Sequence, residues 1–450
     1  MCYVDYFFVM LFKSQLLAKI VALCFNTFQE KFLRRVIFIP VTYAPLWRKL
    51  DERRLTTMQL RISTGIAPNT MTRLRRNEEV SLSILGRICD FLKCDYSDVL
   101  SYVPEEAPNY SARLGTFSIK NRRYLGNKYK LLPFISRVVQ EYCPDVESVA
   151  DIFSGTGSVA SAFNDRHVIT NDILYSNYIC NLAWFSSQDF DENKIGELIT
   201  YYNNINNINV ENYMTRNFAD TYFSRADCAK IGIIREDIER QFQSGFLNER
   251  ERALLIMTLI YAMDKIANTC GHYDAYIRKA VFNRPLVLAF PQASHNNSPE
   301  NICYNEDANK LVRRISADLF YIDPPYNSRQ YCDSYHLLEN VARWEQPEVF
   351  GVARKPDRRN QKSKYCSKNA TEAFADLIAN IRAKYILFSY NNMSNKGNDR
   401  SNSRMTDEDI FKIMGEKGHL RVFEEHHRAF SAGKSSIKDN VERLFLYVRD

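Results

Sequence analysis

The sequence predicts an α/β protein whose main part is a doubly wound, mostly parallel sheet, preceded by a small all-α unit. From residue 122 onward, short apolar strands alternate with helical patterns, which is typical of a parallel sheet covered by helices. Between residues 44 and 104, apolar residues instead recur at the spacing of several short helices. These two patterns define the two parts of the chain.

Composition sets the outer bounds. The chain has 450 residues, of which 45% are hydrophobic and 25% charged, which is ordinary for a globular protein of two or three domains. A net charge of +7 permits a nucleic-acid partner without requiring one. The 11 cysteines include no Cys-x-x-Cys pair, and the 7 histidines form no His-Glu-x-x-His motif. We therefore expect no disulfide framework, no metal site and a cytoplasmic location.

Residues 1–43 form an apolar N-terminal extension. Lys13, Lys19 and Glu30 interrupt it before it is long enough to span a bilayer. Asp5 lies where a signal peptide would carry positive charge, and no small-residue cleavage site follows. We expect an extra packing helix or a translated extension rather than a membrane anchor, and we assign this segment no function.

Residues 44–104 match a helix-turn-helix unit inside a small bundle. Gly65 supplies a tight turn between a helix over "MQLRIST" and a proposed recognition helix over "APNTMTRLRR". The recognition helix would present side chains suited to base edges and phosphates, namely Asn69, Thr70, Arg73 and Arg76. The alternatives are a bundle with a solvated basic face or a protein-docking module. A polar, proline-containing linker over 105–121 follows.

A glycine turn follows the first strand of the larger part. "SVADIFSGTGSVASAF" is a strand that reaches Asp151, followed by Phe153, Gly155 and Gly157 at a turn where the backbone can approach a ligand closely. The next strand ends at Asp172, about twenty residues on, where an acid binds ribose hydroxyls in dinucleotide folds. The third glycine of that fingerprint and a Walker lysine are missing. These residues therefore favour a small nucleoside-bearing cofactor with a positive centre.

The stretch "DLFYIDPPYNSRQY" ends a buried strand in a carboxylate, two prolines and a ring. The apolar run from Leu319 to Ile322 predicts a buried parallel strand, which the prolines end because they have no N–H to donate. A stiff turn at the carboxyl end of a central strand is where open α/β sheets bind ligands. That turn consists of Asp323, Pro324, Pro325 and Tyr326. Taken alone, the stretch is equally compatible with a plain turn that leaves Asp323 in water.

Further strands complete the sheet. "NICYNEDANK" predicts a short strand ending near Asp307, and "AKYILFSYNN" over 383–392 predicts a buried one. "LRVFEEHHRAF" and "VERLFLYVR" predict a closing pair of strands at the C-terminus.

Both parts resemble known families. The helical unit resembles the Cro/repressor-type helix-turn-helix family. Residues 122–450 resemble the Dam-like adenine-N6 DNA methyltransferases, in the group whose cofactor motif precedes the DPPY motif. "RRYLGNKYKLLPFI", "DIFSGTGSV", the acid Asp172 and the DPPY tetrapeptide occur in that family's order. The resemblance implies a Rossmann-like methyltransferase sheet, S-adenosyl-L-methionine as cofactor and double-stranded DNA as substrate.

The resemblance also implies roles for particular residues. The catalytic motif would be Asp323, Pro324, Pro325 and Tyr326. The cofactor-binding residues would be Tyr124, Lys128, Asp151, Phe153, Gly155, Gly157, Asp172, Asp307 and Asp323. A mostly helical insertion at about 185–300 would hold the target-recognition domain. The basic segment 351–368 is either a phosphate-contacting loop or a solvated charge run.

The sequence therefore predicts a site-specific adenine-N6 DNA methyltransferase that flips its target base. Its helix-turn-helix module would bind a separate operator and regulate its own gene. A cognate restriction endonuclease is a further expected type of partner, and no membrane partner is expected. Two alternatives stay open: cytosine-N4 transfer, and a transcriptional regulator with a non-catalytic methylase fold.

Overall fold

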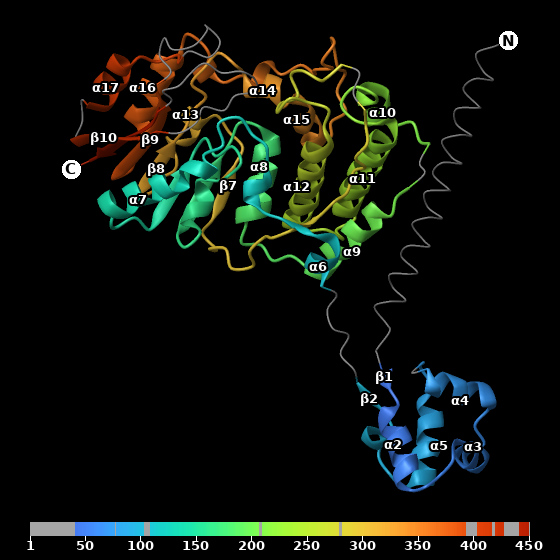
Figure 1. The fold of residues 1–450 in the computed structure, drawn as a ribbon. Coiled ribbons are helices and arrows are strands. Elements are labelled where there is room, and N and C mark those ends of the chain that lie inside the picture. Colours follow the sequence, from blue (N-terminus) through green and yellow to red (C-terminus); the bar gives the residue numbers. More distant parts are fainter. Residues whose placement is uncertain are drawn as a thin grey trace, which may run out of the picture. The chain divides into compact units, whose positions relative to one another are not determined.

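The computed structural model describes residues 41–76, 78–102, 109–206, 209–278, 281–392, 403–415, 419–426 and 441–449. They belong to two compact units that divide between Pro108 and Asn109 (Figure 1). Residues 1–40 of the N-terminal extension and 105–108 of the predicted linker lie outside the described residues. Within the described ranges, no helix is long and apolar enough to cross a membrane.

The first unit is a bundle of short helices with a core of its own. Its elements are α2 (Ala44–Glu52), α3 (Thr57–Thr64), α4 (Pro68–Arg75) and α5 (Leu82–Leu92), with β1 (Val41–Thr42) paired antiparallel to β2 (Ser101–Tyr102). Gly65 ends α3 in the left-handed conformation, with φ 64°, which lets the chain turn into α4. Apolar side chains from α2 to α5 form one cluster, which includes Leu46, Leu60, Leu74, Leu85 and Ile88. The unit has the helix-turn-helix arrangement that the sequence predicts.

The second unit is built on a mixed sheet. Among the described residues, seven strands pair in the order β10-β11-β9-β8-β4-β5-β7. The parallel strands are β4 (Ser148–Asp151), β5 (His167–Asn171), β7 (Ile302–Tyr304), β8 (Leu319–Ile322) and β9 (Tyr385–Asn391). The strands β11 (Val441–Val448) and β10 (His419–His426) close the sheet in antiparallel fashion. The predicted α/β fold, including its closing pair of strands, is confirmed.

The chain reverses its direction of travel across the sheet between β4 and β8. From β4 it continues to β5 on one side, and from β8 it continues to β9 on the other. The two strands are neighbours, with Asp151 opposite Tyr321. Loops that leave such a pair of parallel strands part from each other, so they form a crevice at the carboxyl edge of the sheet. The glycine turn and the DPPY turn both begin at this crevice.

Helices cover the sheet. On one face, an apolar core joins the strands to α13 (Ala308–Leu311), α16 (Ala370–Asn380) and α17 (Asp407–Gly415). The helix α8 (Tyr175–Phe185) packs against β5 and β7, and α15 (His336–Arg343) packs on α8. Further helices of this unit outside the insertion include α7 (Leu132–Tyr142) and α14 (Tyr331–Ser334). A short 3₁₀ helix, η4 (Ala160–Phe163), follows the glycine turn.

The segment between β5 and β7 is mostly helical, as expected for the insertion at about 185–300. Its helices are α9 (Glu192–Asn203), α10 (Tyr213–Phe218), α11 (Arg225–Gln243) and α12 (Glu249–Ile266). The stretch of α12 from Leu254 to Ile260 is fully buried and packs against α8, α11 and α15. The insertion therefore shares its core with the sheet rather than forming a separate lobe.

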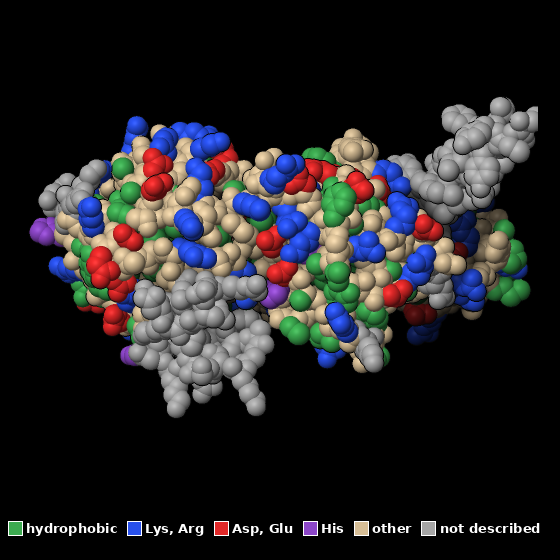
Figure 2. All heavy atoms as spheres, turned by 90° about the horizontal axis from the view of Figure 1, so that it is seen from above, with side chains coloured by type: hydrophobic (Ala, Val, Ile, Leu, Met, Phe, Trp, Pro, Cys, Tyr) green, Lys and Arg blue, Asp and Glu red, His purple; other side chains and the backbone are tan. Residues whose placement is uncertain are grey.

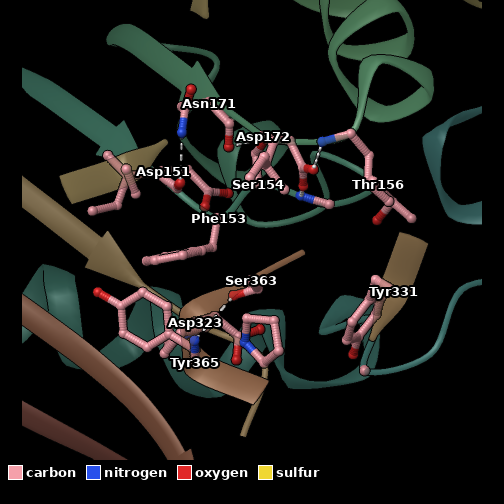
Figure 3. Close-up of a pocket in the computed structure, with 18 of the residues that line it drawn as sticks. Asp151, Phe153, Ser154, Thr156, Asn171, Asp172, Asp323, Tyr331, Ser363 and Tyr365 are labelled. Atoms are coloured by element: carbon pink, nitrogen blue, oxygen red, sulfur yellow. Dashed lines mark hydrogen bonds between the residues drawn. The ribbon is translucent and has the colours of Figure 1, made fainter. Parts of the chain in front are cut away.

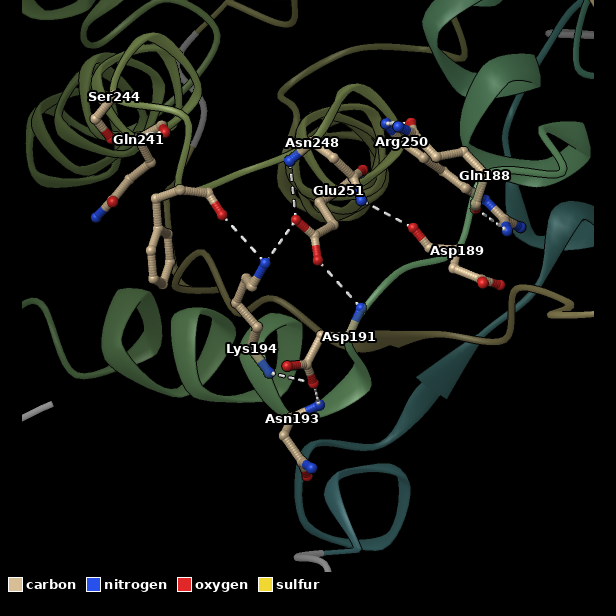
Figure 4. A network of polar contacts seen from close by, with 11 residues as sticks. Gln188, Asp189, Asp191, Asn193, Lys194, Gln241, Ser244, Asn248, Arg250 and Glu251 are labelled. Carbon is tan, nitrogen blue, oxygen red and sulfur yellow. Dashed lines mark hydrogen bonds and ion pairs between the residues drawn. The ribbon is translucent and has the colours of Figure 1, made fainter. Parts of the chain in front are cut away.

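A polar network fixes the helices of the insertion to one another (Figure 4). Glu251, buried in the first turn of α12, accepts hydrogen bonds from Lys194 Nζ of α9 at 2.9 Å and from the Asp191 backbone N–H at 3.1 Å. Arg250, also buried, donates to the carbonyls of Gln188 and Ser294 at 2.8 and 2.7 Å. Because these buried charges have partners, the network favours a single arrangement of the helices.

The linker predicted over 105–121 is too long on its C-terminal side. Residues from Asn109 onward belong to the second unit. The helix α6 (Tyr110–Leu114) contacts α9, and the Tyr110 ring lies so close to Gly196 that a Cβ there would come within 2.2 Å of it. The strand β3 (Thr116–Phe117) then pairs with β6 (Phe290–Pro291). The polar composition of this stretch concealed two buried anchors, Tyr110 and Phe117.

Candidate active site

A pocket opens at the carboxyl edge of the sheet, where β4 and β8 part (Figure 3). It contains about 1070 Å³ of free space, part of which is open to solvent. All but one of the residues predicted for cofactor binding and catalysis line it: Tyr124, Lys128, Asp151, Phe153, Gly155, Asp172, Asp307, Asp323, Pro324, Pro325 and Tyr326. In Figure 3, Asp151, Phe153 and Asp172 face Asp323, Tyr331 and Tyr365 across the space. Segments far apart in the sequence therefore meet at one site.

The exception is Gly157, which does not line the pocket. Gly155 and Gly157 both have left-handed backbones, with φ 52° and 77°. A Cβ on Gly155 would lie 3.4 Å from the Tyr124 ring, so that ring closes over the turn on the pocket side. A Cβ on Gly157 would instead lie 2.5 Å from Asn181 Oδ1 of α8. The second glycine thus serves the packing of the turn on α8, as the third glycine does in dinucleotide folds.

Asp172 joins the end of β5 to the glycine turn. Its Oδ2 accepts the Gly155 N–H at 2.9 Å, and its Oδ1 accepts the Leu174 N–H at 2.8 Å. Burial raises the pKa of Asp172 to about 6, although these backbone donors favour the charged form. Such a carboxylate is held rigidly and still lines the pocket.

Asp323 shares a buried lysine with a second acid. Lys128 Nζ lies 3.0 Å from Asp323 Oδ1 and 3.2 Å from Glu442 Oε1. Burial raises the pKa of Asp323 to about 6, with Lys128 opposing this shift and Glu442 adding to it. Burial alone would lower the pKa of Lys128, but Asp323 and Glu442 outweigh it and hold that pKa well above its ordinary value. The lysine therefore stays charged.

The sequence analysis missed Glu442. The strand β11 runs antiparallel to β9, with Glu442 opposite Asn391, so the first residues of β11 lie at the carboxyl edge of the parallel strands. Glu442 is buried there and accepts a hydrogen bond from Ser389 Oγ at 2.6 Å. The prediction of a closing antiparallel pair contained the signal, because it places the amino end of the last strand beside the pocket.

Tyrosine rings form much of the remaining wall. The Tyr124 ring stacks on Tyr335 with a centroid distance of 4.4 Å and lies 5.4 Å from Tyr331. Tyr335 Oη accepts the Leu125 N–H at 2.7 Å, and Tyr331 Oη donates to the Leu125 carbonyl at 3.2 Å. These contacts fix the segment containing Tyr124 to α14 and to the residue that follows it. The tyrosines Tyr331 and Tyr335 were also missed, although they follow the DPPY motif closely.

The donor set of the pocket suits a nucleoside with a positive centre. Its carboxyl groups belong to Asp151, Asp172, Asp307 and Asp323, and the Phe153 and Tyr365 rings meet edge to face with centroids 5.1 Å apart. Asp151 is buried, and its Oδ1 has no hydrogen-bond partner among the described residues. An unmet acceptor beside other carboxylates fits a cation or hydroxyl donors from a ligand. The described ranges contain no group of three His, Cys, Asp or Glu side chains that could hold a metal ion.

The predicted DNA-contacting residues lie on α4 and just after it. Asn69, Arg73 and Arg76 are exposed, and Thr70 is partly exposed. Arg73 Nε and Arg76 Nη1 lie 3.7 and 3.9 Å from Glu78 carboxylate oxygens. Both arginines therefore have an acidic neighbour, and such exposed pairs contribute little free energy.

Comparison with known families agrees with this geometry. Residues 124–397 match the model of the D12 class N6 adenine-specific DNA methyltransferases, and residues 45–105 match the Cro/C1-type HTH DNA-binding domain. The chain belongs to the D12 class N6 adenine-specific DNA methyltransferase family. The adenine specificity of the family disfavours the cytosine-N4 alternative.

Several modification enzymes are similar to this chain. Modification methylase StsI of Streptococcus sanguinis is 34% identical over 347 residues, which cover 73% of this chain and 52% of that protein. Type II methyltransferase M.FokI of Planomicrobium okeanokoites is 33% identical over 345 residues, covering 72% and 52%. Type II methyltransferase M.NlaIII of Neisseria lactamica is 30% identical over 330 residues, covering 70% and 95%. The chain thus spans about half the length of the first two relatives and nearly all of the third.

Proposed function

We propose that this chain is a site-specific methyltransferase that transfers a methyl group from S-adenosyl-L-methionine to the N6 amino group of adenine in double-stranded DNA. The observation that carries the proposal is the position of Asp323 and Tyr326, on a proline-stiffened turn that opens into the pocket lined by Asp172 and Phe153. Membership of an adenine-specific family supports it.

The pocket residues suit S-adenosyl-L-methionine, which when bound supplies a methyl group on a positively charged sulfur. Asp172 would accept hydrogen bonds from ribose hydroxyls, as the acid after the second strand does in related folds. Tyr124, Phe153 and Gly155 would enclose the nucleoside, and the remaining carboxylates would favour its positive charge. We assign Lys128, Asp151 and Asp307 to the same site.

The chain's contribution to the reaction is to hold the amino group. The amino nitrogen of adenine is a poor nucleophile because its lone pair is delocalised into the ring. Asp323 would accept one N–H, and a carbonyl of the Pro324–Pro325 turn would accept the other, which frees the lone pair to point away from both acceptors. Lys128 favours the ionised form of Asp323, which is the form that accepts.

The target base has to leave the duplex to reach this turn, since a stacked base cannot enter a pocket at the edge of the sheet. Flipping costs a few kcal/mol, and a Tyr326 ring stacked on the base would return roughly 1–3 kcal/mol. The insertion at about 185–300 would choose the site. Its shared core with the sheet would hold the recognition surface at a fixed distance from Asp323.

The direct experiment is sequencing of DNA from an expressing host with detection of modified bases. N6-methyladenine should occur in one sequence context and vanish in an Asp323→Ala variant. N4-methylcytosine instead would overturn the proposed substrate. Absence of any modified base, from a protein that still binds DNA, would favour the non-catalytic regulator. Protection of the modified sequence from a neighbouring endonuclease would test for a restriction partner.

The helix-turn-helix unit would bind a separate operator, because the second unit has its own recognition insertion. A fragment that begins at Asn109 should therefore methylate the same sequence as the whole chain. A start near Thr116 would remove Tyr110, which packs on Gly196. A fragment that ends near Glu106 should bind DNA with an affinity that falls as salt rises. A changed methylation sequence, or no DNA binding by that fragment at low salt, would favour a module that tightens the enzyme or docks another protein.

A further inference from the structure

The basic strap, which we define as residues 351–368, connects the insertion to the catalytic turn. At one end, Tyr222 Oη of the insertion donates to the Ala353 carbonyl at 3.0 Å, and Lys355 forms an ion pair with Asp274. Arg358, three residues further on, forms an ion pair with Asp333 of α14, whose Oδ1 also lies 3.9 Å from Lys355 Nζ. The first half of the strap is therefore fixed both to the insertion and to α14.

Gln330 attaches the strap directly to the loop that follows the DPPY motif. Its Nε2 donates to the Ser363 carbonyl at 3.0 Å, and its Oε1 accepts the Ser363 N–H at 2.9 Å. Ser363 and Lys364 line the pocket, and Lys362 and Lys364 line an adjoining groove. The middle of the strap therefore forms part of the rim.

Three lysines of the strap have free charge. Lys362, Lys364 and Lys368 are exposed, and none forms an ion pair with a described residue. Figure 2, which views the molecule from above Figure 1 where α14 lies, shows Lys and Arg side chains spread over this face. A base that turns about its backbone into the pocket brings its own phosphates to the mouth. Cations fixed at the rim are therefore placed where phosphates would lie.

We propose that the basic strap is a phosphate-binding surface for duplex DNA, with Lys362, Lys364 and Lys368 contacting the backbone beside the flipped base. This inference rests on the proposed function and names the surface that holds the substrate. The same strap contacts the insertion and the loop that follows the catalytic turn. DNA bound to it is therefore held in a fixed position relative to both.

The test compares two triple variants of the full chain with equal loss of charge. One carries Lys362→Ala, Lys364→Ala and Lys368→Ala. The control carries Arg382→Ala, Lys384→Ala and Arg449→Ala, which border a shallow groove at the opposite edge of the sheet. The logarithm of DNA affinity is measured against the logarithm of salt concentration. Each lost phosphate contact should reduce the magnitude of the slope of that line by about 0.9. The slope of the strap variant should therefore be smaller in magnitude by roughly 2 to 3.

The strap variant should also require more DNA for half-maximal rate than the control variant does. An unchanged slope, or an equal change in the control, would overturn the proposal and leave a solvated charge run. The salt slope measures binding alone, so it tests the strap independently of the proposed function. The proposed function fails only if the wild-type protein modifies no DNA.

The buried group formed by Lys128, Asp323 and Glu442 carries a second, independent inference. Lys128 Nζ lies 3.0 Å from Asp323 Oδ1, and Glu442 Oε1 lies 3.2 Å from the same ammonium. With two acids, the ammonium is held between them, and the second oxygen of Asp323 is left to accept from a substrate.

We infer that Glu442 is a positioning residue for the proposed transfer, which holds Lys128 so that it orients Asp323. The other titratable groups facing Asp323 are Asp151 of β4 and the phenols of Tyr321, Tyr326 and Tyr331. Burial raises the pKa of each phenol above its ordinary value, so all three are neutral near pH 6.

The pH dependence of kcat separates this role from a structural one. The acid limb should lie near pH 6 in the wild type, because Asp323 must be ionised and its pKa is about 6. Glu442→Gln removes a negative charge and should move the limb to lower pH by about one unit, with lower kcat and unchanged cofactor affinity. Lys128→Met removes a positive charge and should move the limb to higher pH by about 1–3 units.

Two further variants make the test complete. Glu442→Asp keeps the charge but shortens the reach, so kcat should fall while the limb stays near its wild-type position; an unchanged kcat would overturn the inference even if Glu442→Gln does not fold. Glu251→Gln, at a buried acid paired with Lys194, should leave the limb where it is. The positioning role is contradicted if the acid limb of the kcat profile stays in place in Glu442→Gln and Lys128→Met. It is also contradicted if the limb moves in the same direction in both variants. Wild-type turnover that is lost in Asp323→Ala establishes the proposed function in the same assay.

Discussion

In the insertion, the buried carboxylate of Glu251 meets Lys194 and a backbone N–H, whereas in the pocket Asp151 keeps a buried oxygen without a partner among the described residues. The carboxyl groups of Asp151, Asp172 and Asp323 all have raised pKa values, chiefly because of burial. Both regions bury charge, but the Glu251 carboxylate has partners for its charge, whereas Asp151 Oδ1 has none among the described residues.

This difference separates a region that holds shape from one that receives a ligand. Burying an unmatched carboxylate costs free energy of folding, so such a group persists where something outside the chain completes it. A buried ion pair whose groups already have partners within the chain needs no ligand. Removing one residue of such a pair leaves the charge of the other uncompensated. Substitutions in the two regions should therefore fail in different ways.

The largest effect should come from Asp323→Ala. Loss of the fixed acceptor should lower the rate of methyl transfer roughly 10²–10³-fold or more. S-adenosyl-L-methionine should still bind measurably by calorimetry, because Asp172 and the glycine turn remain in place. A variant with near wild-type turnover would contradict the acceptor role.

The next effect should be on stability. Glu251→Gln removes the acid that pairs with the partly buried Lys194, and should lower the free energy of unfolding by about 1–3 kcal/mol. Asp323→Asn, measured by the same denaturant titration on protein without cofactor, should lower it less, because Glu442 still pairs with Lys128 and burial already disfavours the charge that is lost. Equal losses in both variants would remove the distinction between the two regions.

The smallest effect should be on cofactor affinity as pH falls. The pKa of Asp172 is raised to about 6, so the group is charged above that pH and increasingly neutral below it. If charged Asp172 holds the ribose, affinity for S-adenosyl-L-methionine should fall about tenfold between pH 7.5 and pH 5, at one decade per pH unit below the pKa. Calorimetry on Asp172→Asn should give weaker binding of the cofactor and an affinity that depends less on pH. If the affinity depends on pH as in the wild type, a group other than Asp172 is responsible.

Sequence patterns predicted the parts of this site that local chemistry defines. The glycines of the turn and the prolines after β8 constrain their own backbone, so a short window of sequence identifies them. Gly157 was assigned to the cofactor, because sequence cannot tell a glycine that makes room for a ligand from one that makes room for Asn181. Tyr110 and Glu442 were missed for a similar reason: each acts through a partner distant in the sequence, Gly196 and Lys128.

The place of β11 in the sheet has a consequence for folding. This strand lies between β9 and β10, so it enters the sheet away from its order in the chain. Lys128 and Glu442 lie near opposite ends of the unit's sequence, and contacts of such long range form late because a large loop must close first. An intermediate without β11 would contain Asp323 beside a lysine that nothing holds on its other side. The proposed methyl transfer should therefore report completed assembly of the unit, because it depends on the orientation of Asp323.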